Sequence, residues 1–230
     1  MLKYMASAIG GLIFFVALIA GVAHFAPTTA YDQAAAVYYV KMDAGHGSAV
    51  YIGNGQFVTA AHVAAGAGES QRLLISSGAS ALEPMMPVKV TWMDADKDVA
   101  LLTLVDASQQ SNLATPAHLA CGKADPTVGR HVHAIGFPLN LGKVETWGKV
   151  SQNTGPRPDG QINLLADMTV APGNSGGPAY DFDGDVAGIV VAIPLAPIGP
   201  MSATLIPLTY IVPRSVICER MNVNTLNAKN

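Results

Sequence analysis

Short runs of apolar and β-branched residues recur along the chain from about residue 36, separated by Gly, Asn, Asp and Pro. Such runs predict short β-strands, and their regular spacing is typical of a sandwich or of barrels. The expected fold class is therefore all-β. The predicted strands are Ala36–Met42, Ser48–Gly53, Gln56–Thr59, Arg72–Ser76, Val88–Met93, Val99–Val105, His131–Phe137, Val144–Ser151, Ile162–Met168, Val186–Ile193 and Ala203–Leu208.

Two segments within this region have the pattern of helices. Ala60–Ala65 is long enough for one turn, and Val212–Met221 has Pro213 near its start, where a helix tolerates proline. The turn-rich interval Gln109–Lys123 lies near the middle of the strand region. It predicts a crossing between two all-β halves, and residues 222–230 are left as a tail.

The N-terminal segment differs from the rest of the chain. Met5–Ala23 is almost wholly apolar, and at roughly 1.5 Å per residue a helix of this length would just span a bilayer. Two sites, Gly21–Ala23 and Thr28–Ala30, also fit the small-x-small rule for signal-peptide cleavage. We therefore expect residues 1–26 to be a signal peptide or an uncleaved signal-anchor helix, with a buried core helix as the remaining alternative. Residues 27–35 would form a linker.

The position of Lys3 favours export of everything that follows the apolar segment. The expected location is then outside the cytoplasm, either anchored to the membrane by the N-terminal helix or secreted or periplasmic. Composition supports a folded domain, because 50% of the residues are hydrophobic and only 13% are charged. The net charge of -3 comes without a basic cluster, which argues against nucleic acid as a partner.

One glycine-rich stretch carries candidate chemistry. Pro172–Pro178 reads Pro-Gly-Asn-Ser-Gly-Gly-Pro, so Ser175 would lie on a tight turn without neighbouring side chains to block a substrate. A nucleophilic serine needs donors for the oxyanion, and the N–H groups of Gly173 and Ser175 could converge to supply them. The alternative is an ordinary surface turn, so the assignment depends on finding a base and an acid elsewhere.

His62 is the best candidate for the base, because it follows a predicted strand and the small residues Ala60 and Ala61. None of the six histidines follows Ser175, which excludes the serine-before-histidine order of α/β-hydrolases. Three aspartates, at 94, 96 and 98, could orient the imidazole. Asp98 is preferred because it directly precedes the buried run Val-Ala-Leu-Leu, and a buried carboxylate needs a partner.

These blocks resemble the signatures of trypsin-like serine proteases of the chymotrypsin fold. The resemblance rests on Thr59–His62, Asp98–Leu102 and Gly173–Pro178. Two further blocks, Gly45–Ile52 and Ala134–Pro138, are similar to the bacterial HtrA-like branch. The resemblance covers roughly residues 36–221, leaves no room for the PDZ domain that HtrA proteases usually carry, and implies nothing about oligomeric state.

The resemblance implies two six-stranded β-barrels, at about residues 36–108 and 124–210, followed by the C-terminal helix at about 212–221. His62 and Asp98 would come from the first barrel and Ser175 from the second, acting as base, orienting acid and nucleophile. The amides of Gly173 and Ser175 would form the oxyanion hole. Such an enzyme cleaves peptide or protein substrates without a metal or an organic cofactor.

Two residues of this chain differ from those of the resembled family at positions that affect specificity and activation. Thr169 stands at the family's primary specificity position, where a neutral residue leaves a substrate Lys or Arg unpaired. With Val190, Val191 and Ala192 as the expected pocket wall, we expect small or medium aliphatic residues before the cleaved bond. Asn174 replaces the aspartate of digestive relatives, so activity without propeptide removal is expected.

Digestive relatives often join the two regions that hold the only cysteines of this chain, Cys121 and Cys218. The resemblance and the expected export together predict a Cys121–Cys218 disulfide, with two free buried thiols as the alternative. Metal sites are not expected: His131 and His133 offer only two ligands, and Asp181–Asp185 is interpreted as a hairpin turn at Asp183-Gly184.

Three functions fit the sequence. The first is a serine endopeptidase that acts through an acyl-enzyme. The second keeps the fold but makes it a catalytically silent protein that binds peptides in the cleft. The third is an esterase that uses the same triad.

Overall fold

The computed structural model describes residues 30–70, 72–80, 83–156, 162–199 and 202–227. The expected signal peptide or anchor at residues 1–26, and most of the expected linker, lie outside these ranges. Across the described ranges, no helix is long and apolar enough to cross a membrane.

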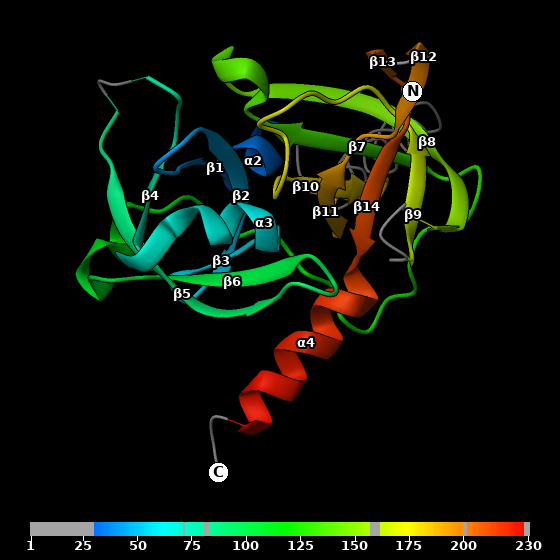
Figure 1. Ribbon diagram of the computed structural model, residues 1–230. Coiled ribbons are helices and arrows are strands. Elements are labelled where there is room, and N and C mark those ends of the chain that lie inside the picture. The colour runs from blue at the N-terminus through cyan, green and yellow to red at the C-terminus, as the bar shows by residue number, and fades with distance from the viewer. Residues whose placement is uncertain (1–29, 71, 81–82, 157–161, 200–201, 228–230) are drawn as a thin grey trace, which may run out of the picture.

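Six antiparallel strands close into the first barrel, seen at the left of Figure 1. They are β1 (Val37–Lys41), β2 (His46–Gly53), β3 (Gln56–Thr59), β4 (Arg72–Ser76), β5 (Met86–Asp94) and β6 (Val99–Leu104). Their order around the barrel is β1-β2-β3-β6-β5-β4, and the pairing of β1 with β4 closes it. All six match strands that the apolar runs predict, because these runs supply the buried barrel interior.

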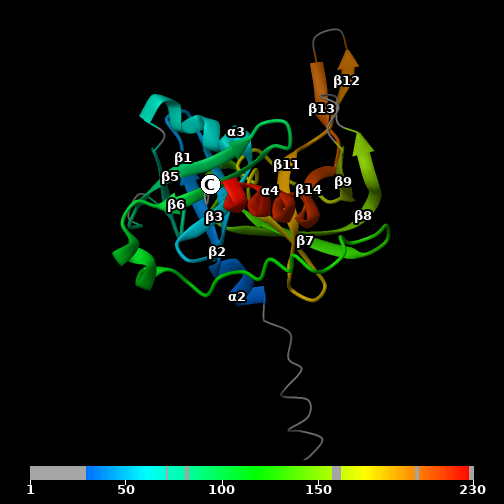
Figure 2. The ribbon, with the colours of Figure 1, turned by 90° about the horizontal axis from the view of Figure 1, so that it is seen from below.

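The second barrel, at the right of Figure 1, is also closed and six-stranded. Its strands are β7 (His131–Gly136), β8 (Val144–Pro156), β9 (Ile162–Asp167), β10 (Pro178–Asp181), β11 (Val186–Ala192) and β14 (Thr209–Pro213), in the order β10-β11-β14-β9-β8-β7. A separate hairpin of β12 (Leu195–Gly199) and β13 (Ser202–Leu205) projects from it, as Figure 2 shows. The predicted all-β class with two six-stranded barrels is confirmed.

In the second half of the chain one strand prediction is wrong and two strands were not predicted. The expected strand Ala203–Leu208 is divided, because β13 ends at Leu205 and the barrel strand β14 begins only at Thr209. The whole of β14 is buried and pairs with β9 and β11, so tertiary pairing sets its limits. Strands β10 and β12 have no counterpart among the predicted strands. The short β10 directly continues the glycine-rich turn, which hides it in the sequence.

The helices also differ from prediction in their limits. The described helices are α2 (Ala30–Ala35), α3 (Ala61–Ala64) and α4 (Arg214–Asn227), with 3-10 segments η1 (Ala65–Ser70), η2 (Ala107–Asn112) and η3 (Pro138–Asn140). Helix α2 lies where a linker was expected. Helix α4 begins at Arg214 instead of Val212, because Val212 and Pro213 still pair with β11, and it continues beyond Met221.

The crossing segment runs from the first barrel to the second. Its Ala114 N–H donates to the Tyr38 hydroxyl at 3.0 Å, and its Ala117 N–H donates to Tyr51 O at 2.8 Å. Further along, His118 O accepts from Val186 N–H of β11 at 2.9 Å. These bonds make the crossing part of the junction between the barrels.

Helix α4 is fastened to the end of the crossing, below the barrels in Figure 1. A disulfide joins Cys121 to Cys218, with their Cα atoms 5.5 Å apart. The Asp125 carboxylate accepts from Ser215 N–H at 3.1 Å and from the Ser215 hydroxyl at 2.5 Å, which satisfies donors in the first turn of the helix. Arg214, 1% exposed, donates to Ala124 O at 3.0 Å.

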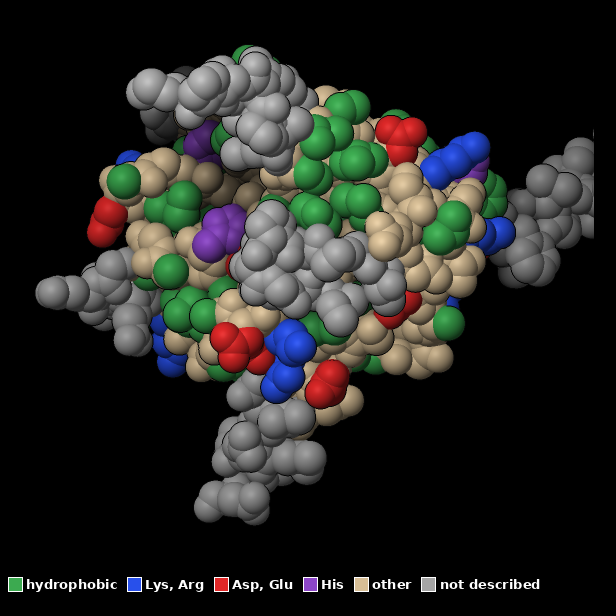
Figure 3. All heavy atoms as spheres, turned by 45° about the vertical axis from the view of Figure 1, so that its right-hand side comes forward, with side chains coloured by type: hydrophobic (Ala, Val, Ile, Leu, Met, Phe, Trp, Pro, Cys, Tyr) green, Lys and Arg blue, Asp and Glu red, His purple; other side chains and the backbone are tan. Residues whose placement is uncertain are grey.

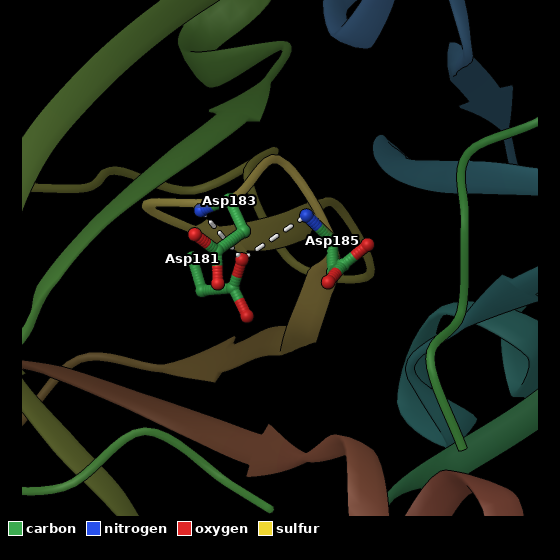
Figure 4. Close-up of side chains that lie close together, drawn as sticks. All are labelled: Asp181, Asp183 and Asp185. Atoms are coloured by element: carbon green, nitrogen blue, oxygen red, sulfur yellow. Dashed lines mark hydrogen bonds between the residues drawn. The ribbon is translucent and has the colours of Figure 1, made fainter. Parts of the chain in front are cut away.

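The hairpin between β10 and β11 gathers three carboxylates, those of Asp181, Asp183 and Asp185 (Figure 4). The Asp181 carboxylate accepts from the N–H groups of Asp183 and Asp185, which shapes the turn, and Gly184 lies at φ 87°. Lys123 Nζ lies 2.8, 2.6 and 2.7 Å from the three carboxylates in sequence order. Although burial opposes it, these hydrogen bonds hold the pKa of Lys123 above its usual value. The expected hairpin turn is present, with its charge met by a lysine of the crossing.

Helix α2 attaches the start of the described chain to the second barrel. The Gln33 side chain accepts from His133 Nε2 at 3.0 Å, and Gln33 O accepts from the Tyr180 hydroxyl at 3.0 Å. His133 is 4% exposed and stacks on Trp147 with ring centroids 4.3 Å apart. Burial lowers the pKa of His133 to about 4, with a smaller opposing effect from the Asp181 charge.

Surface charge shows no large cluster of one sign on the face drawn in Figure 3. Hydrophobic side chains gather in the middle of that face, and acidic and basic side chains are scattered around it.

Replacing both Cys121 and Cys218 with Ala should lower the free energy of unfolding by about 2–5 kcal/mol. The bond closes a long loop, at a sequence separation of 97, so its loss raises the conformational entropy of the unfolded chain. Urea unfolding of the variant and of the parent protein measures this. The parent in excess reductant should approach the variant, and identical midpoints for all three samples would contradict the expectation.

Lowering the pH from about 6.5 to 4 should destabilise the parent protein by about 2–4 kcal/mol relative to a His133→Phe variant. The unfolded chain binds a proton at His133 near pH 6.5, whereas the folded chain does so only near pH 4. The stability that the folded protein gains from a neutral His133 is therefore complete above pH 6.5, and it is lost as the pH falls to 4. Unfolding free energies at several pH values test this, and parallel curves for the two proteins would contradict it.

Candidate active site

His62 is carried to the protein surface by the end of β3. Its neighbours Ala60 and Ala61 are buried, and Thr59 is anchored by a 2.7 Å hydrogen bond from its hydroxyl to Ser48 O. The chain then turns into α3, in which Val63 and Ala64 are buried while 47% of the His62 side chain is exposed. The small, buried residues around it thus leave the imidazole as the accessible group of this turn.

Asp98 lies beneath the His62 ring, in the turn that joins β5 to β6. His62 Nδ1 lies 2.9 Å from Asp98 Oδ1 and 3.1 Å from Oδ2, and the His62 N–H donates to Oδ1 at 3.1 Å. A carboxylate only accepts, so the proton of the neutral imidazole is on Nδ1 and the lone pair is on Nε2. Asp98 is 5% exposed and has φ 54°, a left-handed conformation that Asp tolerates better than most residues.

The other two aspartates of this turn lie elsewhere. Asp94 pairs with Arg220 of α4, with Nε and Oδ2 3.1 Å apart, and it also caps Lys97 N–H at 3.0 Å. Asp96 is exposed. Of the three candidates, the structure brings Asp98 to His62.

Four consecutive carbonyls, those of residues 172–175, hold the turn around Ser175. Leu139 N–H donates to Pro172 O at 2.8 Å, and the Ser48 hydroxyl donates to Gly173 O at 2.7 Å. Gly177 N–H donates to Asn174 O at 2.9 Å, and Ser48 N–H donates to Ser175 O at 2.8 Å. Ser48, a buried residue of the first barrel, therefore holds two of the four carbonyls.

These bonds also decide where the N–H groups point. In a trans peptide the N–H points away from the C=O, and the described chain has no cis peptide. Fixing Pro172 O and Asn174 O thus fixes the N–H groups of Gly173 and Ser175. Among the described residues, neither of these N–H groups finds an acceptor. Gly173 adopts φ 104°, a conformation that favours glycine.

The turn lies directly against the segment that leads to His62. A Cβ added to Gly176 would lie 2.1 Å from Thr59 Oγ1 and 3.0 Å from Ala60 N. One added to Gly47 would lie 2.7 Å from a Val63 methyl group and 3.1 Å from Ser175 O. Thr59 and Ala60, which precede His62, therefore lie against Gly176 of the serine turn, and Val63, which follows it, packs against Gly47. Within the described part of the chain, no hydrogen bond joins Ser175 Oγ to His62, which is common before substrate binds.

The expected substrate-binding residues have different surroundings. Thr169 is exposed and Ala192 is partly exposed, whereas Val190 and Val191 are 2% and 3% exposed and pack into the cores. The main chain of Val190 pairs with the turn, accepting from Gly176 N–H at 2.7 Å and donating to Gly177 O at 2.9 Å. The strand β11 thus supports the turn mainly through its backbone.

The sequence interpretation missed the contribution of β2 to this site. Its block Gly45–Ile52 was noted, but no role was given to Ser48 or to His46, whose Nε2 lies 2.8 Å from Phe137 O. A polar residue in an otherwise apolar strand next to a glycine was the available signal.

Comparisons with known proteins find chains of similar sequence and structure. The profile of the trypsin-like peptidase domain family matches residues 47–189. The chain is 33% identical over 162 residues to "Protease Do-like 1, chloroplastic" of Arabidopsis thaliana, covering 67% of this chain and 34% of that protein. It is 38% identical over 141 residues to a "Probable periplasmic serine endoprotease DegP-like" of Halomonas elongata, covering 59% of this chain and 27% of that protein.

A solved structure is also similar. The "HtrA-type protease AlgW with tripeptide" has a TM-score of 0.65 and 25% sequence identity, covering 85% of this chain and 63% of that chain. The chain spans between about a quarter and a third of the length of these two curated relatives.

Proposed function

Because the chain belongs to the trypsin-like peptidase domain family, with HtrA- and DegP-type serine proteases among its relatives, we propose that it is a serine endopeptidase. The observation that carries the proposal is the 2.9 Å contact between His62 Nδ1 and the buried Asp98 carboxylate, which leaves the Nε2 lone pair to act as a base. Peptide and protein chains are the proposed substrates. The residues of this site suffice for the reaction without a metal or an organic cofactor.

The proposed reaction begins when His62 Nε2 takes the Ser175 hydroxyl proton as Oγ attacks the peptide carbonyl carbon. The tetrahedral intermediate collapses when its C–N bond breaks and the imidazolium returns the proton to the leaving amine. Water, activated by the same base, then hydrolyses the acyl-enzyme. Asp98 keeps the ring in the required tautomer and stabilises its charged form.

The N–H groups of Gly173 and Ser175 are the proposed oxyanion hole. Their directions are set before substrate binds, so no reorganisation is needed as negative charge develops on the carbonyl oxygen. Preorganised donors of this kind each contribute roughly 2.7–4 kcal/mol to transition-state stabilisation in comparable enzymes.

We also propose that the protein acts outside the cytoplasm. The apolar N-terminal segment supports export, as do relatives described as periplasmic. We propose residues 1–26 as the export segment, either a signal peptide or a signal-anchor helix.

Wild-type protein should react covalently with a fluorophosphonate probe at Ser175, and Ser175→Ala should not react. Asp98→Asn should lower kcat by about 10,000-fold, because Asn favours the wrong imidazole tautomer. The matched control is Asp96→Asn, an exposed residue of the same turn, which should keep full activity. Mass spectrometry locates the label and peptide hydrolysis gives kcat.

Failure of the folded wild type to react would favour the silent peptide-binding protein. Turnover of esters without any peptide cleavage would favour the esterase. Either result would contradict the proposal.

Peptide-library cleavage should show a preference for small or medium aliphatic residues before the cleaved bond. A Lys or Arg side chain there would meet the neutral Thr169 and find no charged partner. Thr169→Asp should therefore increase cleavage after Lys and Arg. A preference of the wild type for Lys or Arg, or no response to Thr169→Asp, would contradict this assignment.

A further inference from the structure

Two side chains of β2 hold the main chain of Phe137, which follows β7 in the second barrel. Ser48 Oγ accepts from Phe137 N–H at 3.1 Å, and His46 Nε2 lies 2.8 Å from Phe137 O. Alternate residues of a strand point to the same face, so positions 46 and 48 are suited to this pair of contacts. Because a carbonyl oxygen only accepts, His46 carries a proton on Nε2.

The residues after Phe137 connect this contact to the serine turn. Leu139 and Asn140 both have left-handed backbones, at φ 51° and 58°, which is unfavourable for a residue such as Leu. In this segment the Leu139 N–H donates to Pro172 O at 2.8 Å. The Tyr39 hydroxyl donates to Asn140 Oδ1 at 3.2 Å. A conformation of this cost persists only when neighbouring contacts enforce it.

His46 also touches the turn itself. A Cβ added to Gly173 would lie 2.3 Å from His46 Nε2 and 2.3 Å from Phe137 O. Gly173 therefore packs directly against the two atoms that form the His46–Phe137 hydrogen bond. The His46 ring is oriented by stacking on Tyr39, with centroids 5.2 Å apart and ring planes 11° apart.

From these contacts we propose that His46 is a positioning residue for the oxyanion hole. Its Nε2–H holds Phe137 O, which places Leu139 N–H on Pro172 O and so keeps the Gly173 N–H directed at the substrate carbonyl oxygen. The inference rests on the proposed function, because it assigns a role in the same reaction. His46 itself transfers no proton in that reaction.

The test compares His46→Phe with His46→Gln. Phe keeps an aromatic ring on Tyr39 but has no donor, and Gln restores an N–H donor. His46→Phe should lower kcat about 10- to 100-fold, less than the roughly 100- to 1,000-fold loss when an oxyanion donor is deleted. KM should change less than about twofold, since ground-state binding does not use the hole. His46→Gln should recover most of kcat.

Binding measurements separate this role from a general loss of structure. Affinity for a peptide boronic acid, whose tetrahedral adduct with Ser175 occupies the oxyanion hole, should fall in parallel with kcat. Binding of uncleaved peptide, measured with His46→Phe in a Ser175→Ala background, should stay unchanged. The control is His131→Phe, an exposed histidine of β7, which should leave kcat and both affinities unchanged.

The outcomes distinguish the two proposals. A wild type that does not react with fluorophosphonate overturns the endopeptidase. If the wild type reacts and His46→Phe is equally active, the role of His46 is overturned. A change in KM alone, or an equal loss of kcat in His46→Phe and His46→Gln, also overturns it. Should His46→Phe fail to fold, Ser48→Ala removes the neighbouring contact with Phe137 N–H and Gly173 O, and the same fall in kcat at constant KM is expected.

Discussion

The contact between Ser48 and the serine turn is the interaction on which the rest of the site depends. One residue of the first barrel donates its N–H to Ser175 O and its hydroxyl to Gly173 O, so it joins the two barrels at the position of the nucleophile. Ser48 is fully buried, and a buried hydroxyl or carbonyl without a partner is costly. The turn therefore has one favourable place to dock, and docking there brings it beside the segment that carries His62.

The junction is reinforced away from the site by polar groups that satisfy one another. Arg214 and Lys123 meet the carboxylate of Asp181, at 2.9 and 2.8 Å, and the Cys121–Cys218 bond fastens α4 to the crossing. Helix α2 is attached to the second barrel through Gln33. Buried charges are tolerated in these places because each has its partner. Since the crossing is also bound to Tyr38 and Tyr51 of the first barrel, the two barrels are held in one relative position, which a site divided between them requires.

Much of this arrangement could be predicted from the sequence. Eleven runs of apolar residues predicted the strands, and all six strands of the first barrel lie where these runs do. The strands β10 and β14 were missed or displaced because one continues a glycine-rich turn and the other is defined by pairing with distant strands. Helix α2 was missed because its stability comes from contacts with His133 and Tyr180, about 100 and 147 residues away in sequence.

The sequence by itself determined the chemistry of the candidate site: which serine lies in a glycine-rich turn, which histidine follows a strand, and which aspartate precedes a buried run. Each of these properties depends on residues that are neighbours in the sequence, so the sequence alone reveals it. The tertiary structure alone decided that Lys123 would meet three carboxylates and that His46 and Ser48 would hold the turn. Such contacts join residues whose separation along the chain carries no signal, and only the closing of both barrels places their atoms within hydrogen-bonding distance.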